Sequence, residues 1–130
     1  IVFFGDHQPM VEEDFYETLS GKPLFEWTLA EAQQRYVVPF FIWANYEIDA
    51  EENVFTSANF LSELMFEKAG IKLLPYQKFL KEVREEILAM DGGAWRDKNG
   101  TWEVLDTSQP ILEEYWRLQY RNIFDKKVHY

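Results

Sequence analysis

The residues best suited to chemistry in this sequence are Asp6 and His7, which follow an apolar run and a glycine. In an extended strand, neighbouring side chains point to opposite faces, so a carboxylate and an imidazole at adjacent positions do not meet. Gly5 lets the backbone bend as the strand ends, so the two side chains can converge on one cation. They suit a borderline divalent ion such as Zn²⁺ or Mn²⁺. The sequence therefore predicts a metal-binding pair, with a hydrogen-bonded loop pair as the alternative.

Two side chains are fewer ligands than a metal ion needs. A zinc site takes about four, and the only other histidine, His129, lies one residue from the end and is expected to be solvated. The 130 residues contain no cysteine, which excludes a disulfide framework, a thiol nucleophile and a zinc–thiolate site. If Asp6 and His7 bind a metal, we expect the remaining ligands to come from outside this chain.

A cluster of acidic residues, Glu47, Asp49, Glu51 and Glu52, is a second candidate for a cation site. A calcium loop would need Asp or Asn at alternate positions and a glycine, and this segment lacks both features. The sequence therefore favours a solvated acidic loop.

Aromatic residues form the remaining candidates. Trp95 and Trp102 could stack a sugar or a base, but packing across a hairpin onto the domain is the expected role. Asn45 and Tyr46 follow an apolar run and could line a cleft. A stripe near the C-terminal end is expected to be core; it consists of Tyr115, Trp116, Gln119 and Tyr120.

Two predicted strands position the first candidate. The apolar run 1–4 is typical of a strand covered on both faces, as in a parallel sheet, and open α/β sheets bind ligands at the carboxyl ends of such strands. A second strand is predicted over 37–44. Because Pro39 has no N–H to donate, this strand either begins there or is paired on one side only at that point.

Helices and a hairpin complete the predicted α/β fold, which has few sheet strands with helices packed on them. Asn99-Gly100 predicts a β-hairpin over 94–105. Apolar spacing and end signals predict helices over 11–19, over 26–35, from a cap at Thr56 or Ser57 to Gly70, from Pro75 to a break at Asp91, and over 111–124 after a cap at Ser108.

Composition and charge exclude several classes of protein. Hydrophobic residues make up 47% and aromatic residues 18%, which excludes a disordered chain. The net charge of −10 excludes nucleic acid as a partner, and residues 1–60 hold 11 acidic but only two basic side chains. No run approaches the roughly 18 apolar residues of a membrane span. The chain begins at Ile1, inside an expected buried strand, so we expect it to be a fragment.

The candidate pair lies within a segment that resembles a known motif. Phe3-Phe4-Gly5-Asp6-His7-Gln8-Pro9 is similar to the late metal-binding motif of bacterial sulfatase-like phosphoglycerol transferases, the lipoteichoic acid synthase group of the alkaline phosphatase superfamily. The segments 39–46, 57–61, 75–80 and 118–125 resemble the C-terminal region of the same group. The resemblance covers nearly the whole chain. It implies that residues 1–130 are a single C-terminal fragment of an alkaline phosphatase-like or sulfatase-like catalytic domain.

The resemblance also implies a reaction. Asp6 and His7 would hold a divalent metal, manganese in many members, with Zn²⁺, Mg²⁺ and Ca²⁺ as alternatives; a Glu and a nucleophilic Thr from upstream sequence would complete the site. The Thr would attack a lipid or glycan phosphodiester, form a covalent phospho-threonine and pass the group to an acceptor. No catalytic nucleophile is expected within this chain. The fragment alone is therefore expected to be inactive, its partner being the missing N-terminal part of its own domain.

The resemblance leaves the substrate open. Gln8-Pro9 departs from better-known members of the group, so the group handled could be phosphoglycerol, phosphoethanolamine or sulfate, by transfer or by hydrolysis. Members of the group carry membrane spans before an extracytoplasmic domain, so we expect the parent at the cell membrane and this fragment to be soluble.

The alternative to this enzyme class is a non-catalytic acidic module that binds a protein or a glycan.

Overall fold

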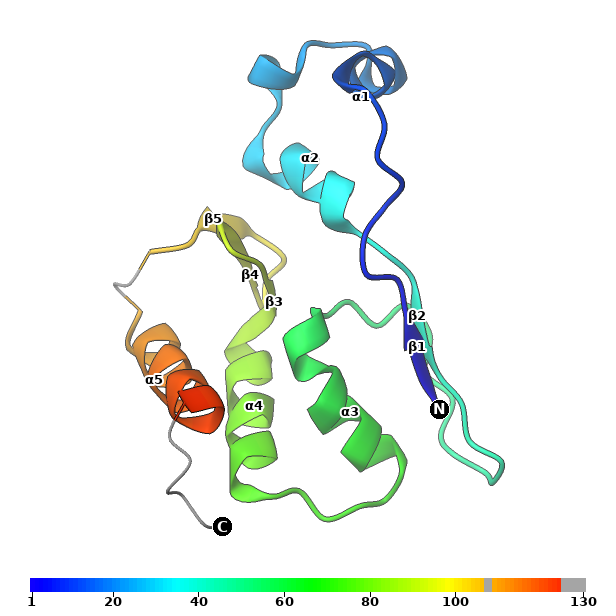
Figure 1. The fold of residues 1–130 in the computed structure, drawn as a ribbon, viewed down its shortest axis with the longest axis vertical. Helices are drawn as coiled ribbons and strands as arrows, with labels where there is room; N and C mark the ends of the chain where they lie inside the picture. Colours follow the sequence, from blue (N-terminus) through cyan, green and yellow to red (C-terminus); the bar gives the residue numbers. More distant parts are fainter. Residues whose placement is uncertain (107–108, 125–130) are drawn as a thin grey trace. The chain divides into compact units, whose positions relative to one another are not determined.

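The computed structural model describes residues 1–106 and 109–124, which form a mixed α/β architecture (Figure 1). The predicted helix cap Ser108 and the second histidine, His129, lie outside the described residues. Within the described part there are five α-helices and two small antiparallel sheets. The chain divides into two compact units, residues 1–48 and residues 49–130.

The first unit combines a two-stranded ribbon with short helices. Strands β1 and β2 pair antiparallel, with Val2 opposite Ile42 and Phe4 opposite Phe40. The apolar, aromatic character of both segments suits an extended, paired backbone. In chain order the elements are β1 (Val2–Phe4), α1 (Glu13–Ser20), the 3-10 helix η1 (Leu24–Glu26), α2 (Leu29–Gln33), the 3-10 helix η2 (Gln34–Tyr36) and β2 (Phe40–Ile42).

The environment of β1 differs from the prediction. The strand was expected to lie in a parallel sheet covered on both faces, but it pairs antiparallel with β2, and the Phe3 and Phe4 residues are 59% and 47% exposed. An apolar run of four residues specifies an extended segment without specifying its neighbour or its cover. The prediction for Pro39 is confirmed, because β2 begins directly after it and the Pro39 carbonyl accepts a hydrogen bond of 3.1 Å from the Gly5 N–H.

Local signals in the sequence explain the helices of this unit. Helix α1 ends at Gly21, whose φ of 73° lies in the left-handed region that glycine adopts without strain. Helix α2 begins with a capping box, in which the Thr28 hydroxyl accepts from the Glu31 N–H and the Glu31 carboxylate accepts from the Thr28 N–H. A hydrogen bond from Lys22, followed by those from Thr28, lowers the pKa of Glu31 from 4.5 to about 2.

The second unit contains the hydrophobic core. In Figure 1, α4 lies between α3 and α5, and the chain passes from α4 directly into β3. The elements are the 3-10 helix η3 (Ala58–Phe60), α3 (Leu61–Lys68), α4 (Pro75–Glu86), β3 (Ile87–Met90), β4 (Ala94–Asp97), β5 (Trp102–Val104) and α5 (Pro110–Phe124). The core cluster consists of Phe60, Leu80, Val83, Ile87, Trp95, Leu112 and Tyr115.

The predicted helix after Pro75 ends earlier than expected. It was predicted to continue to the break at Asp91, but α4 ends at Glu86 and residues 87–90 form the strand β3. Ile87 is buried in β3, and its spacing from Leu80 and Val83 also fits a helix, so the helical spacing of apolar residues continued past the true end of the helix. The predicted hairpin over 94–105 is confirmed as β4 and β5, and β3 adds a third antiparallel strand to it.

Two further predictions in this unit are wrong in part. Ser57 precedes η3 but makes no capping bond; its hydroxyl donates to Asn59 Oδ1 at 2.5 Å and accepts from the Met90 N–H at 3.0 Å. In α5 the predicted core stripe is buried at Tyr115 and exposed at Tyr120, because only the first half of the helix packs on the core cluster. No helix within residues 1–106 and 109–124 is long and apolar enough to cross a membrane.

Candidate functional site

Asp6 and His7 lie in an exposed turn directly after β1. The side chains of Asp6 and His7 are 85% and 77% exposed, and His7 Nε2 lies 3.6 Å from Asp6 Oδ2. The turn is closed by the His7 backbone N–H, which donates to Asp6 Oδ1 at 3.0 Å. The bend that was predicted from Gly5 therefore brings the two side chains to the same side of the backbone, although they are neighbours in the chain.

The second ring nitrogen of His7 has a defined partner. Nδ1 lies 2.7 Å from the carbonyl oxygen of Gln8, which can only accept, so Nδ1 carries the proton of this hydrogen bond. In the neutral ring Nε2 then holds a lone pair, and Nε2 is the ring nitrogen that lies 3.6 Å from Asp6 Oδ2. Metal-binding histidines commonly donate their other N–H to a carbonyl in this way, which fixes the tautomer and the ring orientation.

The separation of Nε2 and Oδ2 fits two ligands of one ion. Neighbouring ligands about 2.1 Å from a metal lie about 3.4 Å apart in the tetrahedral geometry of zinc and about 3.0 Å apart in the octahedral geometry of Mn²⁺; the observed distance is 3.6 Å, so a small movement of either exposed side chain would serve either ion. Since both atoms are acceptors when the ring is neutral, a proton or a cation between them is needed to make the contact attractive. The chemistry of the pair and its geometry are therefore both compatible with a divalent metal ion.

Gly5 lies against the side chain of Val38, which leaves no room for a Cβ atom. A Cβ atom at this position would lie 2.9 Å from the Cβ of Val38, closer than real carbon atoms approach. On the other side, the Gly5 N–H donates to the Pro39 carbonyl. The sequence predicted a bend at Gly5, and the structure adds that a side chain at this position would require the turn or Val38 to shift.

The pair is not joined by a third ligand within the part of the chain that the structure describes. No group of three or more His, Asp, Glu or Cys side chains is placed there to hold a metal. The acidic cluster over 47–52 does not form such a group. A complete coordination sphere would need ligands in addition to Asp6 and His7.

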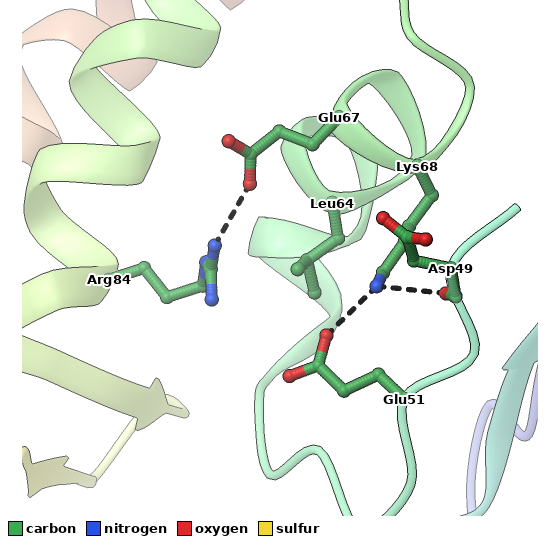
Figure 2. A pocket seen from close by; sticks show the side chains of 6 residues that line it. All are labelled: Asp49, Glu51, Leu64, Glu67, Lys68 and Arg84. Atoms are coloured by element: carbon green, nitrogen blue, oxygen red, sulfur yellow. Dashed lines mark hydrogen bonds and ion pairs between the residues drawn. The ribbon is translucent and has the colours of Figure 1, made fainter.

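The acidic cluster instead contributes to a pocket of about 270 Å³ in the second unit (Figure 2). Lys68 Nζ lies 3.0 Å from Glu51 Oε2 and donates to the Asp49 carbonyl at 3.2 Å. These two contacts attach the acidic loop to α3, while Glu47 and Glu52 are exposed. The lining residues are Asp49, Glu51, Leu64, Glu67, Lys68 and Arg84.

A second set of ion pairs connects α3 and α4 beside this pocket. Arg84 donates from Nε to Glu63 Oε2 at 2.8 Å and from Nη2 to Glu63 Oε1 at 3.2 Å, and it also reaches Glu67 Oε2 at 3.3 Å. Lys81 pairs with the other oxygen of Glu67. Each cation that lines the pocket is thus bound to a carboxylate of the protein, which makes the pocket a structural network.

Burial affects the two glutamates of this network differently. Glu63 has no exposed surface, and desolvation raises its pKa against the opposing effect of Arg84. Desolvation also acts to raise the pKa of Glu67, but the hydrogen bond from Lys81 and further contacts lower it overall. The network was not predicted from the sequence. The available signal was complementary charge on consecutive helices, with acids four residues apart on one and bases three apart on the other.

Among the aromatic candidates, the two tryptophans pack against other side chains. Trp95 is only 8% exposed and belongs to the core cluster, as predicted. Trp102 packs edge-on against Phe55 with ring centroids 6.2 Å apart. Asn45 and Tyr46 are exposed, and the pocket described above is lined by neither of them.

The candidate site therefore consists of Asp6 and His7, supported by Gly5 and Gln8, on the first unit. These residues lie in the segment between β1 and α1. Compared with known proteins, the chain matches no family model, no curated protein and no solved structure.

Proposed function

We propose that the chain is the C-terminal part of a metal-dependent phosphotransferase of the sulfatase-like type, in which Asp6 and His7 supply two ligands of a divalent ion, Mn²⁺ first among them. One observation carries the proposal. His7 Nε2 and Asp6 Oδ2 are exposed and 3.6 Å apart, while the other ring nitrogen is engaged by the Gln8 carbonyl. The resemblance of residues 3–9 and of the later segments supports the reaction class.

The residues of this chain have limited roles in such a reaction. Asp6 contributes a negative charge and an oxygen ligand, and His7 contributes a neutral nitrogen ligand. A bound divalent ion would lower the pKa of a hydroxyl nucleophile and withdraw charge from phosphoryl oxygens. The nucleophilic Thr and the pocket for a lipid or glycan phosphodiester belong, in this proposal, to sequence outside the chain. The parent would act on the outer side of the bacterial membrane.

The proposal can be tested on the chain itself by titrating Mn²⁺ and following the amide NMR signals, which this paramagnetic ion broadens at short range. We expect weak binding, because two ligands are too few for a tight site, and we expect broadening first at residues 5–8. His7→Ala should remove it, whereas Asp14→Ala, which deletes an acidic side chain of α1, should leave it unchanged. Broadening centred on residues 47–52, or tight stoichiometric binding by the chain alone, would contradict the proposal.

One observation favours a second candidate, an acidic module that binds a protein surface. Residues 1–48 are all described, and no apolar side chain among them is buried. On the ribbon, Phe3 and Phe41 stack with ring centroids 5.3 Å apart and are 59% and 54% exposed. Exposed aromatic groups of this kind are enriched where proteins bind one another. The same surface also suits a fragment whose natural cover is the rest of its domain.

The coding sequence distinguishes the two candidates directly. A reading frame that continues upstream through membrane spans and a Thr after an apolar strand favours the transferase. A start codon near Ile1 favours the binding module. In addition, the module requires no metal, so His7→Ala and Asp6→Ala should leave its partner binding unchanged.

A further inference from the structure

Gln8 connects the candidate metal pair to the rest of the first unit. Its side-chain Nε2 donates to the carbonyl of Gln34 at 2.9 Å and to the carbonyl of Val37 at 2.7 Å. Its own backbone carbonyl accepts from Nδ1 of His7 at 2.7 Å. One residue thus holds the His7 ring with its backbone and the η2–β2 segment with its side chain.

We propose that Gln8 is a positioning residue that orients the His7 ring, so that Nε2 is presented to a metal ion beside Asp6. The metal-binding part of this inference rests on the function proposed above. The orienting part does not, because it follows from hydrogen bonds that need no metal. The two parts can therefore fail separately.

The chemistry of the side-chain amide explains why Gln8 can hold the turn against another segment of the unit. The amide nitrogen has two hydrogens, so it can donate to both carbonyls at once. The opposite orientation of the amide would place its oxygen against both carbonyls, so only one orientation is favourable. The accepting carbonyls are those of Gln34, the first residue of η2, and of Val37, directly after η2; the Gln34 carbonyl also accepts from the Val37 N–H at 3.4 Å.

The consequence for His7 follows from its exposure. A ring that is 77% exposed gains little orientation from packing. Its described polar contacts are those with Asp6 and Gln8. If the side-chain hydrogen bonds of Gln8 are lost, the Gln8 carbonyl moves with the turn. The proton on Nδ1 of His7 is then free to move to Nε2. A protonated Nε2 has no lone pair for a metal ion.

The geometry is specific for glutamine. Asparagine is one methylene shorter, and glutamate would place a carboxylate against two carbonyl oxygens. Gln8→Met keeps the approximate length of the side chain and removes both donors, so it is the sharpest variant. Gln34→Ala is the matched control, because Gln34 contributes only its backbone carbonyl to the hydrogen bonds of Gln8 and its side chain is exposed.

The test is heteronuclear NMR of the ring nitrogens in the metal-free chain, at a pH where the ring is neutral, with His129→Ala used to assign the two histidines. We expect His7 protonated on Nδ1 in the wild type and in Gln34→Ala, and a shift toward the Nε2-protonated form in Gln8→Met and Gln8→Asn. The Mn²⁺ concentration needed for broadening at residues 5–8 should rise about 10-fold or more in Gln8→Met.

The outcomes separate the two claims. An unchanged His7 tautomer in both Gln8 variants overturns the inference, whatever the metal does. A tautomer that changes as expected supports Gln8 as the orienting residue. If, at the same time, Mn²⁺ never affects residues 5–8 of the wild type, the proposed metal site is wrong while the orienting role of Gln8 stands.

Discussion

Arg84 of α4 donates two hydrogen bonds to Glu63 of α3, a residue with no exposed surface. Removing a carboxylate from water is costly, and a planar guanidinium that binds both of its oxygens is the arrangement that best offsets the cost. Because α3 and α4 each contribute one partner, the pair also fixes how these two helices pack. Glu67 and Lys81 extend the same network toward solvent.

Arg84→Met should strongly destabilise the second unit, because it leaves the Glu63 charge buried without a partner. We expect a loss of about 3–5 kcal/mol in the free energy of unfolding, measured by urea unfolding of the chain. The double variant Glu63→Leu/Arg84→Met should recover most of this loss, since it removes both charges. A cost for Arg84→Met as small as that of the exposed Lys78→Ala, about 0.5 kcal/mol or less, would show that the pair is not important for stability.

The capping box of α2 should make that helix sensitive to acid. The pKa of Glu31 is lowered from 4.5 to about 2, first by the hydrogen bond from Lys22 and then by those from Thr28. A carboxyl group whose pKa is lower in the folded state stabilises that state above pH 4.5, and the contribution is lost as the pH falls from 4.5 to about 2. NMR titration of the Glu31 carboxyl carbon should give a midpoint near the lower value.

Substitution of Lys22 provides the control for this titration. Lys22→Met removes the largest cause of the shift and should move the midpoint toward 4.5, whereas Lys22→Arg keeps a cation and should retain most of it. If the wild-type carboxyl already titrated at 4.5, the ion pair and capping box would not persist in solution.

Gly5→Ala should disturb the candidate metal pair without touching either ligand. The added methyl group would lie 2.9 Å from Val38 Cβ, so the turn or Val38 must shift. We expect metal affinity to fall about 10-fold or more, as for other residues that support metal ligands, measured by Mn²⁺ titration. Gly5→Ala/Val38→Gly removes the obstructing side chain and should recover part of the affinity. Full affinity in the single variant would mean that the turn is not held by this close approach.

Local signals predicted much of the second unit. Asn99-Gly100 specified the turn of the hairpin, where Gly100 adopts a φ of 89°, and Pro75 marked the start of α4. Gly70, with a φ of 66°, follows the end of α3 as expected. Each of these features is specified by a few neighbouring residues, so it can be predicted from a short stretch of the sequence.

Features that depend on distant partners were not predictable in the same way. The apolar run 1–4 was identified as a strand, but its antiparallel partner β2 lies about forty residues away and could not be identified from the run itself. The buried position of Glu63 depends on Arg84 of the next helix. At the candidate site, Gly5, Asp6 and His7 were predicted from their order in the chain, whereas the role of Gln8 depends on the carbonyls of another segment.

The most direct test of the metal-ligand proposal is the metal content of the longer parent protein that the proposal requires, measured by elemental analysis after purification without chelators. The proposal predicts that Asp6→Ala and His7→Ala each lose most of the bound divalent metal together with phosphotransferase activity, while Asp14→Ala keeps both. Undiminished metal content in both Asp6→Ala and His7→Ala would contradict it.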